Sequence, residues 1–268
     1  MTKHDKEHIE SLLKSKKDLV VELKENKLSG INLTGADLQG MDLRGAHLQG
    51  FNLEEANLKD ADISGANLKD AVLIDANLMD SNLRNVNLKN ADLSRADITK
   101  ANLEGANFEG ASFKGADLAE ANLSNSDGTG ADFSYANMHG AKLKDATLKN
   151  SNSRCVNLAF SESENINFES ADLKDADFSY ANFSHANLSH ANLKQASLSY
   201  TNFSHADLSH VDLERTESVG ADITYADMEE ANLNEANMKE ADFSHANMKG
   251  VSTQDTNLLG AKLKHAKK

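Results

Sequence analysis

The chain has 268 residues, a formal net charge of −14, no proline and a single cysteine, Cys155. One cysteine excludes an internal disulfide and is typical of a reducing compartment. There is no apolar N-terminal signal and no apolar run of about 18 residues, so we expect a cytoplasmic protein without membrane contact.

Residues 1–25 stand outside the pattern that dominates the rest of the chain, and they carry six lysines and six acids. Ile9, Leu12 and Leu13 have helical spacing, and an apolar segment ending at Leu23 follows them. Because a terminal unit of a solenoid needs a cap, these residues predict a short, partly helical N-terminal cap.

A five-residue pattern runs from Asn26 to His265 without insertion or deletion, in 48 consecutive blocks of the form A(D/N)LXX. Residues 36–40 read ADLQG and residues 66–70 read ANLKD, and residues 266–268 are left as a C-terminal tail. A period of five matches neither a helix nor a strand. Each block therefore predicts a short strand and a turn, with its Leu and its Ala facing one interior.

This pattern resembles the pentapeptide-repeat family over about nine-tenths of the chain. The resemblance implies an all-β fold, a right-handed parallel quadrilateral β-helix in which four blocks form one square coil. Applied to residues 26–265, it implies a solenoid of about twelve four-sided coils. Residues 20 apart then stack on the same side of the rod, and three of every five residues face solvent.

A few blocks lack the large apolar residue at their centre and have a small one there: Gly128, Ser153, Ser163, Ser218 and Thr253. Large residues one coil away, such as Phe108 and Leu148 beside Gly128, are expected to fill the space. We therefore favour a tolerated variant coil over a binding cavity at these positions.

Two kinds of ring column are expected on the outside of the rod. Phe160, Tyr180 and Tyr200 share one corner of successive coils. Such an aromatic column predicts either an anchor for a protein partner, since Tyr is favoured at binding hot spots, or a ladder that stabilises neighbouring coils. Histidines 20 residues apart form further columns, which local duplication of an SHA(N/D)(L/F) unit explains without a metal site. We expect no metal and no other cofactor.

Serine, histidine and aspartate are abundant, but catalysis requires them to converge in a protected site with oxyanion donors. The repeat spreads them over a convex, solvated surface and leaves no long loop. No glycine-rich phosphate loop, CxxC pair or HExxH motif is present. We expect no catalytic residues and no enzymatic activity.

The acidity of the chain belongs to the repeat, and 15 of its 42 acids are aspartates at the position where a block takes Asp or Asn. The stretch from Asp207 to Asp242 carries more negative charge than the repeat pattern requires. It has eleven acids and only two cations, Arg215 and Lys239, which gives a net charge of −9. Residues 207–242 form fewer than two coils and extend roughly 9 Å along the rod, a length over which duplex DNA carries about five charges. We call the eleven acids the acidic band: Asp207, Asp212, Glu214, Glu217, Asp222, Asp227, Glu229, Glu230, Glu235, Glu240 and Asp242.

The acidic band favours a basic partner. Gyrase-protecting quinolone-resistance members of the family are thought to act as DNA mimics, so the resemblance implies a similar role here. We expect a non-enzymatic interaction scaffold, an acidic DNA-mimicking rod whose partner is a protein such as DNA gyrase or another topoisomerase, with no direct binding of nucleic acid. The alternative is a structural or protein-recruiting solenoid unrelated to DNA mimicry, which would use the aromatic column.

The C-terminal end of the repeat has no helical segment to cover it, because only five residues follow Leu263. An open sheet end is a template for pairing. Either the terminal lysines prevent such pairing or two chains meet there. We favour a homodimer through the C-terminal coil, with Met248, Leu258 and Leu263 at the contact.

Overall fold

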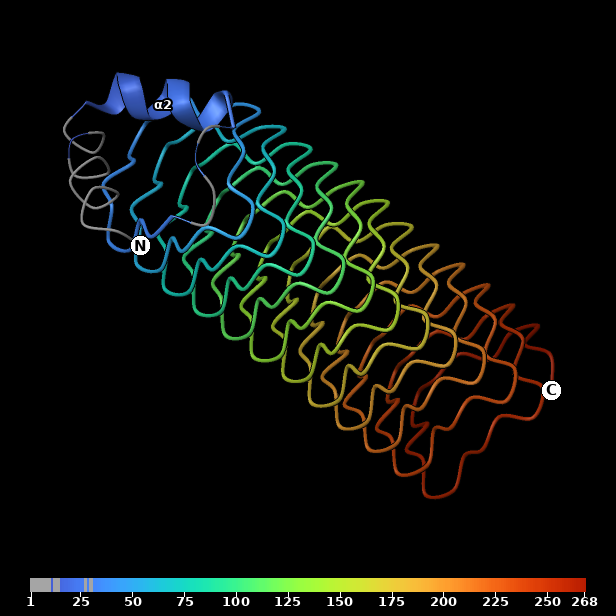
Figure 1. Cartoon of the computed structure of the whole chain (residues 1–268). Coiled ribbons are helices and arrows are strands. Elements are labelled where there is room, and N and C mark those ends of the chain that lie inside the picture. The colour runs from blue at the N-terminus through green and yellow to red at the C-terminus, as the bar shows by residue number, and fades with distance from the viewer. Residues whose placement is uncertain (1–10, 12–14, 27, 29–30) are drawn as a thin grey trace.

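The computed structural model describes residues 11, 15–26, 28 and 31–268 as a straight rod of stacked coils, with the C-terminus at the end opposite to residues 15–26 (Figure 1). One helix, α2 (Lys16–Lys24), lies at the N-terminal end. It is too short to cross a membrane, and no helix among the described residues is long and apolar enough to do so. The helical spacing at Ile9, Leu12 and Leu13 lies outside the described residues.

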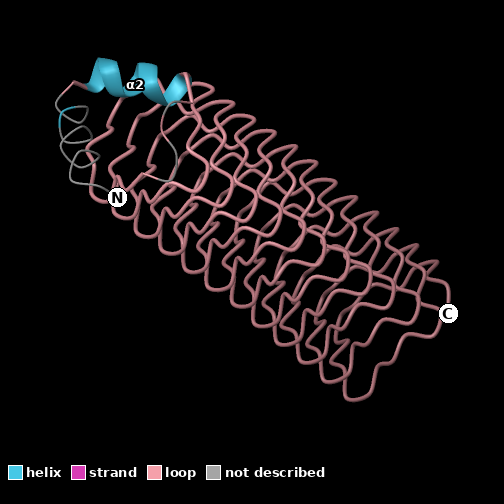
Figure 2. Ribbon diagram, viewed as in Figure 1, coloured by secondary structure: helices cyan, strands magenta, loops and turns pink. Residues whose placement is uncertain are grey.

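The coils are held together by parallel β-bridges between residues 20 apart, and each coil contains four of them. Asn32 pairs with Asn52 in this way, and Asp37 pairs with Asn57. The bridges are one residue long, and none of the described residues belongs to an extended strand, so Figure 2 shows the coils as loops. The expected short strand is therefore a single bridge residue, because a turn interrupts the chain every five residues.

Each turn is closed locally and also bonded to the neighbouring coil. In the first described block, the Ala36 N–H donates to the Leu33 carbonyl at 3.0 Å across the turn, and the Leu33 N–H donates to the Asn52 carbonyl of the next coil at 2.7 Å. The last residue of the block, here Gly35, is the third of the four turn residues and has a φ of +66°. This left-handed conformation closes a type II-like turn and is the reason for glycine or asparagine at many of these positions.

The Asp or Asn of each block stabilises the same turn with its side chain. The Asn32 Oδ1 accepts the Thr34 N–H at 2.9 Å, and the Asp62 Oδ1 accepts the Ser64 N–H at 3.0 Å. Asn can in addition donate to the previous coil, as the Asn82 Nδ2 does to the Asp62 Oδ1 at 3.1 Å. A carboxylate cannot donate, so Asp and Asn are equivalent for the turn but not for the bond between coils.

The core is a single column of central Leu, Ile, Met and Phe residues lined by alanines, and nearly all of it is buried. One aromatic part of the core contains Phe108, Phe113 and Phe133, whose ring centroids lie 4.9–5.8 Å apart. At the N-terminal end, Leu19 and Leu23 of α2 are buried against the same core.

The buried small central residues are accommodated in two ways, whereas Thr253 is exposed near the C-terminal end. At Gly128 the Phe108 and Leu148 side chains occupy the space where a side chain would stand. At Ser153 and Ser163 the small residue two positions earlier is also a serine, and the two hydroxyl groups bond to each other at 3.0 Å and 2.9 Å. No buried side-chain N or O among the described residues lacks a partner. These coils are therefore filled or internally bonded.

Candidate interaction surfaces

The acidic band encircles the rod. In the coil of residues 201–220, side one holds residues 201–205, side two 206–210, side three 211–215 and side four 216–220, and residues 20 apart share a side. The eleven acids of the band are divided among all four sides. The number of acids on each side, and the cations beside them, therefore decide where a partner can bind.

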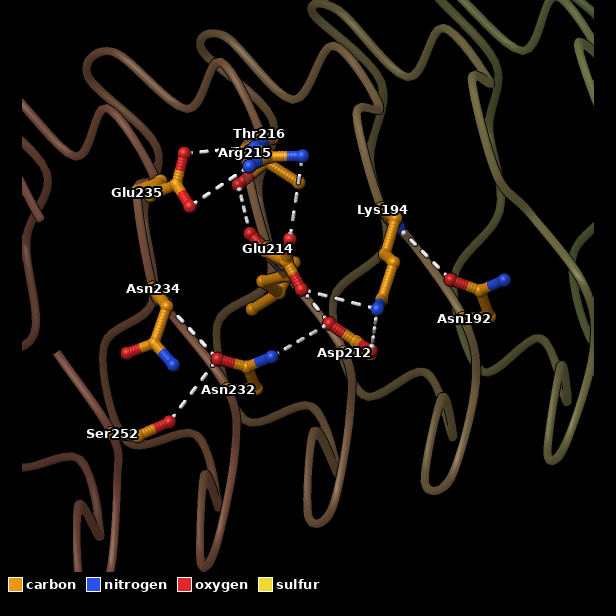
Figure 3. Close-up of polar contacts among 11 residues, drawn as sticks. Asn192, Lys194, Asp212, Glu214, Arg215, Thr216, Asn232, Asn234, Glu235 and Ser252 are labelled. Carbon is orange, nitrogen blue, oxygen red and sulfur yellow. Dashed lines mark hydrogen bonds and ion pairs between the residues drawn. The ribbon is translucent and has the colours of Figure 1, made fainter. Parts of the chain in front are cut away.

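Side three is largely neutralised by cations (Figure 3). The Lys194 Nζ lies 3.1 Å from a carboxylate oxygen of Asp212 and 3.1 Å from one of Glu214. The Arg215 guanidinium donates two hydrogen bonds to the Glu235 carboxylate, of 2.8 Å and 3.0 Å. This contact lowers the pKa of the Glu235 carboxyl and raises that of Arg215. Three acids and two cations leave side three with a net charge of −1.

Side two keeps most of its charge. It holds Asp207, Asp227, Glu229 and Glu230, and among the described residues the only Lys or Arg at ion-pair distance from these four acids is Lys249, so their net charge counted with this cation is −3. The Lys249 Nζ lies 2.6 Å from Glu229 and lowers the pKa of that carboxyl, with a smaller contribution from His210.

The other carboxylates of side two have uncharged partners or a histidine. The Asp207 Oδ1 accepts bonds from Ser209, and the Asp227 Oδ1 accepts the Asn247 side-chain amide at 2.8 Å. Glu230 faces the His210 Nδ1 at 3.3 Å. Asp207 and Asp227 are bridge partners, so two carboxylates stack in successive coils.

On each of sides one and four, the net charge is counted from two acids of the band and the one lysine at ion-pair distance from them. On side one, Asp222 stacks on Asp242, and the Lys262 Nζ lies 3.2 Å from Asp242. On side four, Glu217 accepts the Asn237 amide at 2.6 Å and Glu240 lies 3.4 Å from the Lys239 Nζ. Each of these sides has a net charge of −1, so the acidic character of the band is concentrated on side two.

Three of the neutralising cations lie outside the stretch from Asp207 to Asp242 in the sequence. Lys194 precedes it, and Lys249 and Lys262 follow it. Each reaches its acid from the neighbouring coil, at a separation of 18 or 20 residues. A comparison of residues 20 apart would have found them, whereas a count of charges along the chain could not.

The aromatic column is a stack of rings with their faces together. The ring centroids of Phe160 and Tyr180 lie 5.1 Å apart and 10° from parallel, and those of Tyr180 and Tyr200 lie 5.1 Å apart and 14° from parallel. The side chains are about half exposed, and the Tyr180 ring has a stacked ring on each of its faces. At Gly220 the Tyr200 ring occupies the position of a side chain and ends the stack.

The histidines also stack. His185, His205, Tyr225, His245 and His265 form one continuous series with centroids 4.6–5.0 Å apart. On the next corner, His190 and His210 lie 4.7 Å apart and 3° from parallel. Nowhere in the described part of the chain do three or more His, Cys, Asp or Glu side chains gather as metal ligands would.

The C-terminal coil leaves part of the core open. Met248 is 8% exposed and is covered by the last coil, whereas Leu263, the central residue of the last block, is 38% exposed. Leu259, at an outward turn position of the same end, is 69% exposed. Leu258 is half-buried. Of the three residues expected at a dimer contact, Leu258 and Leu263 therefore lie on the open end and Met248 lies one layer inside it.

Comparison with known proteins identifies the repeat. The family described as "Pentapeptide repeats" matches residues 39–75, 76–115, 111–150, 154–189, 176–215 and 219–252. No curated protein matches the chain.

HetL and QnrB1 are among the solved structures that resemble it at low similarity. HetL, a protein involved in heterocyst differentiation regulation from the cyanobacterium Nostoc sp. strain PCC 7120, is 28% identical, with a TM-score of 0.35 and coverage of 78% of this chain and 88% of HetL. A trypsin-treated variant of QnrB1, a plasmid-mediated fluoroquinolone resistance protein, is 23% identical, with a TM-score of 0.42 and coverage of 64% of this chain and 89% of QnrB1.

Proposed function

The chain belongs to the pentapeptide-repeat family, and on that premise we propose that it is an acidic DNA-mimicking rod whose side two binds a nucleic-acid-binding enzyme such as DNA gyrase. The family fold, a right-handed quadrilateral β-helix, is a repeat scaffold. The observation that carries the proposal is the uneven neutralisation of the acidic band. Side two keeps a net charge of −3, whereas each other side keeps −1.

The charge density of side two supports mimicry of DNA. Its four carboxylates lie in two successive coils, which span roughly 10 Å of the rod. Duplex DNA presents about six phosphates over the same length, on two strands that face different directions. A basic groove that contacts one face of a duplex would therefore meet a similar density of negative charge on side two.

A supercoiling assay with DNA gyrase, in the presence and absence of a fluoroquinolone, tests this function. The protein is expected to alter supercoiling or drug-induced cleavage at micromolar concentration, and the absence of any effect would refute the proposal. The side-two variant Asp207→Asn, Asp227→Asn and Glu230→Gln is expected to lose the effect. Each of the two aspartates accepts a backbone N–H of its own turn with its Oδ1 atom. Asn keeps this acceptor, so the variant is expected to keep its fold.

A matched control on side three removes the same number of charges. The variant Asp212→Asn, Glu214→Gln and Glu235→Gln takes away acids that are already paired with Lys194 and Arg215. It is expected to act on gyrase as the unaltered protein does. Equal loss in the two variants would show that total charge, and not side two, determines binding.

The second candidate is a structural or protein-recruiting solenoid unrelated to DNA mimicry. The half-exposed aromatic column of Phe160, Tyr180 and Tyr200 supports it. The covered ring faces favour a role in stabilising neighbouring coils over insertion into a partner's pocket. Tyr180→Ala together with Tyr200→Ala is expected to lower the unfolding temperature and to leave any effect on gyrase unchanged.

The open C-terminal coil supports self-association. Its apolar Leu259 and Leu263 are exposed, and the backbone N–H groups of Leu258 and Leu263 have no backbone acceptor among the described residues. A second copy of the same coil would supply both apolar contact and backbone partners. We include a homodimer through this coil in the proposal.

A further inference from the structure

We propose that the stacked histidines along both edges of side two make the binding of a basic partner dependent on pH, so that binding weakens as the pH falls from about 8 to about 5.5. Histidine is the side chain that gains a positive charge in this interval. The inference concerns regulation of side two and therefore rests on the function proposed above.

The first edge of side two is the series of five stacked rings. The His185 and His205 centroids lie 5.0 Å apart, and Tyr225 lies 4.9 Å from His205. His245 follows at 4.6 Å from Tyr225, parallel to it, and His265 lies 4.9 Å beyond. His205 and His245 have a ring contact on both faces, which holds these imidazoles at the corner where side one meets side two.

The second edge is the pair His190 and His210. Their rings lie 4.7 Å apart and nearly parallel. The His210 Nδ1 faces the Glu230 carboxylate at 3.3 Å, on the edge of the acidic side itself. Protonation of this pair would turn that contact into an ion pair and withdraw Glu230 from a partner.

The charged groups around the two edges are mostly acids, those of side two and, on side one of the first edge, Asp222 and Asp242 with the Lys262 ammonium. The carboxylates of Asp207, Asp227 and Glu229 lie between the edges, together with the Lys249 ammonium. Outside them, Asp212 follows the His210 corner, and Lys264 and Lys267 flank His265 in the last coil. Acidic groups therefore predominate along most of the stack, and lysines stand beside it at His265.

The ring contacts limit the number of protons that the edges take up. Two imidazolium rings about 5 Å apart repel each other, so one proton on each stacked histidine pair is favoured over two. In the first edge, the Tyr225 ring offers its faces to His205 and His245, at distances within which a cation is attracted to an aromatic ring. One proton for each of the three histidine pairs adds three positive charges, which cancels the net charge of −3 on side two.

The test measures the binding of a fluorescein-labelled decalysine peptide to the full chain by fluorescence anisotropy at about pH 8 and about pH 5.5, at one low ionic strength. The unaltered protein is expected to bind roughly tenfold more weakly at the lower pH, because three exposed charge contacts are lost. Circular dichroism must show the same folded rod at both pH values, and loss of the signal at the lower pH would overturn the inference.

The decisive variant replaces His190, His205, His210 and His245 with Gln. Gln195 occupies the same turn position with a φ of +61°, so glutamine is compatible with this backbone. The variant is expected to bind decalysine with less than about a twofold difference between the two pH values. A variant with only His205→Gln and His210→Gln is expected to show a pH dependence of decalysine binding between those of the unaltered protein and the four-histidine variant.

The matched control replaces His47 and His139, which lie far from side two of the acidic band, and is expected to keep the full pH dependence. Equal binding at the two pH values by the unaltered protein, or full pH dependence in the four-histidine variant, would overturn the inference and leave the proposed function standing. Absence of decalysine binding at both pH values would overturn both. A failed gyrase assay with a normal decalysine result would reject gyrase as the partner and keep the pH-dependent site.

Discussion

At the scale of single residues, the last position of each block explains both the glycines and the exposed rings. In the described part of the repeat this residue has a φ of +53° to +75°, whether it is Gly, Asp, His or Tyr. Such a conformation costs a residue with a side chain roughly 1–2 kcal/mol. Rings at this position recover contact energy by stacking on the ring one coil away, whereas a lone side chain does not.

Two glycines allow the effect of the backbone to be separated from that of the aromatic stack. Gly130→Ala places a Cβ at a φ of +70° in open space and is expected to cost about 1 kcal/mol. Gly220→Ala, at a φ of +66°, places its Cβ 2.7 Å from the Tyr200 ring and is expected to cost about 1–3 kcal/mol more. Urea unfolding of both variants measures the difference, and equal costs would show that the Tyr200 ring does not rest on Gly220.

At the scale of elements, the repeat behaves as a stack of coils joined by directional contacts. Backbone N–H groups, asparagine side chains and most ion pairs link residues 18–21 apart. The helix α2 takes part in the same network, because the His47 N–H donates to the Leu23 carbonyl at 3.0 Å and Lys16 pairs with Asp37 at 3.0 Å. Stability should therefore be transmitted mainly between neighbours.

The contribution of α2 can be tested within one helix. Leu23 is fully buried, so Leu23→Ala is expected to cost about 2–5 kcal/mol in the adjoining coils. Val21 is 45% exposed, and Val21→Ala is expected to change stability by less than about 0.5 kcal/mol. Hydrogen exchange should become faster near residues 31–60 in the Leu23 variant and stay unchanged near residues 200–240. Faster exchange along the whole rod would contradict transmission between neighbours only.

At the scale of the whole molecule, a net charge of −14 is spread over a rod whose two ends differ. Helix α2 packs on the core at one end, whereas Leu259 and Leu263 are exposed at the other. A charged rod of this kind repels its copies along its sides, so the open end is the favourable place for association.

Light scattering tests that association. The protein is expected to have the mass of a dimer, and the variant Leu259→Glu with Leu263→Glu is expected to have the mass of a monomer, because four carboxylates would then meet at the contact. A control variant, Val21→Glu on the exposed face of α2, is expected to remain a dimer. A monomeric mass for the unaltered protein would eliminate the contact.

The sequence by itself determined the register, the inward-facing positions and the columns of residues 20 apart. These follow from a turn every five residues, which is a local property of each block and is not changed by distant contacts. The family resemblance, the stacked rings of Tyr180 and Tyr200 and the filling of Gly128 by Phe108 were all predicted from this register and agree with the structure.

Only the tertiary structure decided which charges remain unneutralised and which parts of the rings are exposed. Whether Lys194 reaches Asp212 and Glu214, or Lys249 reaches Glu229, depends on side-chain length and on the spacing of adjacent coils. Charge counted along the chain predicted one acidic band of −9, but cations paired with its acids leave −1 on each of three sides and −3 on side two. The physical reason is that ion pairs and ring contacts form across coils, between residues that the linear sequence separates.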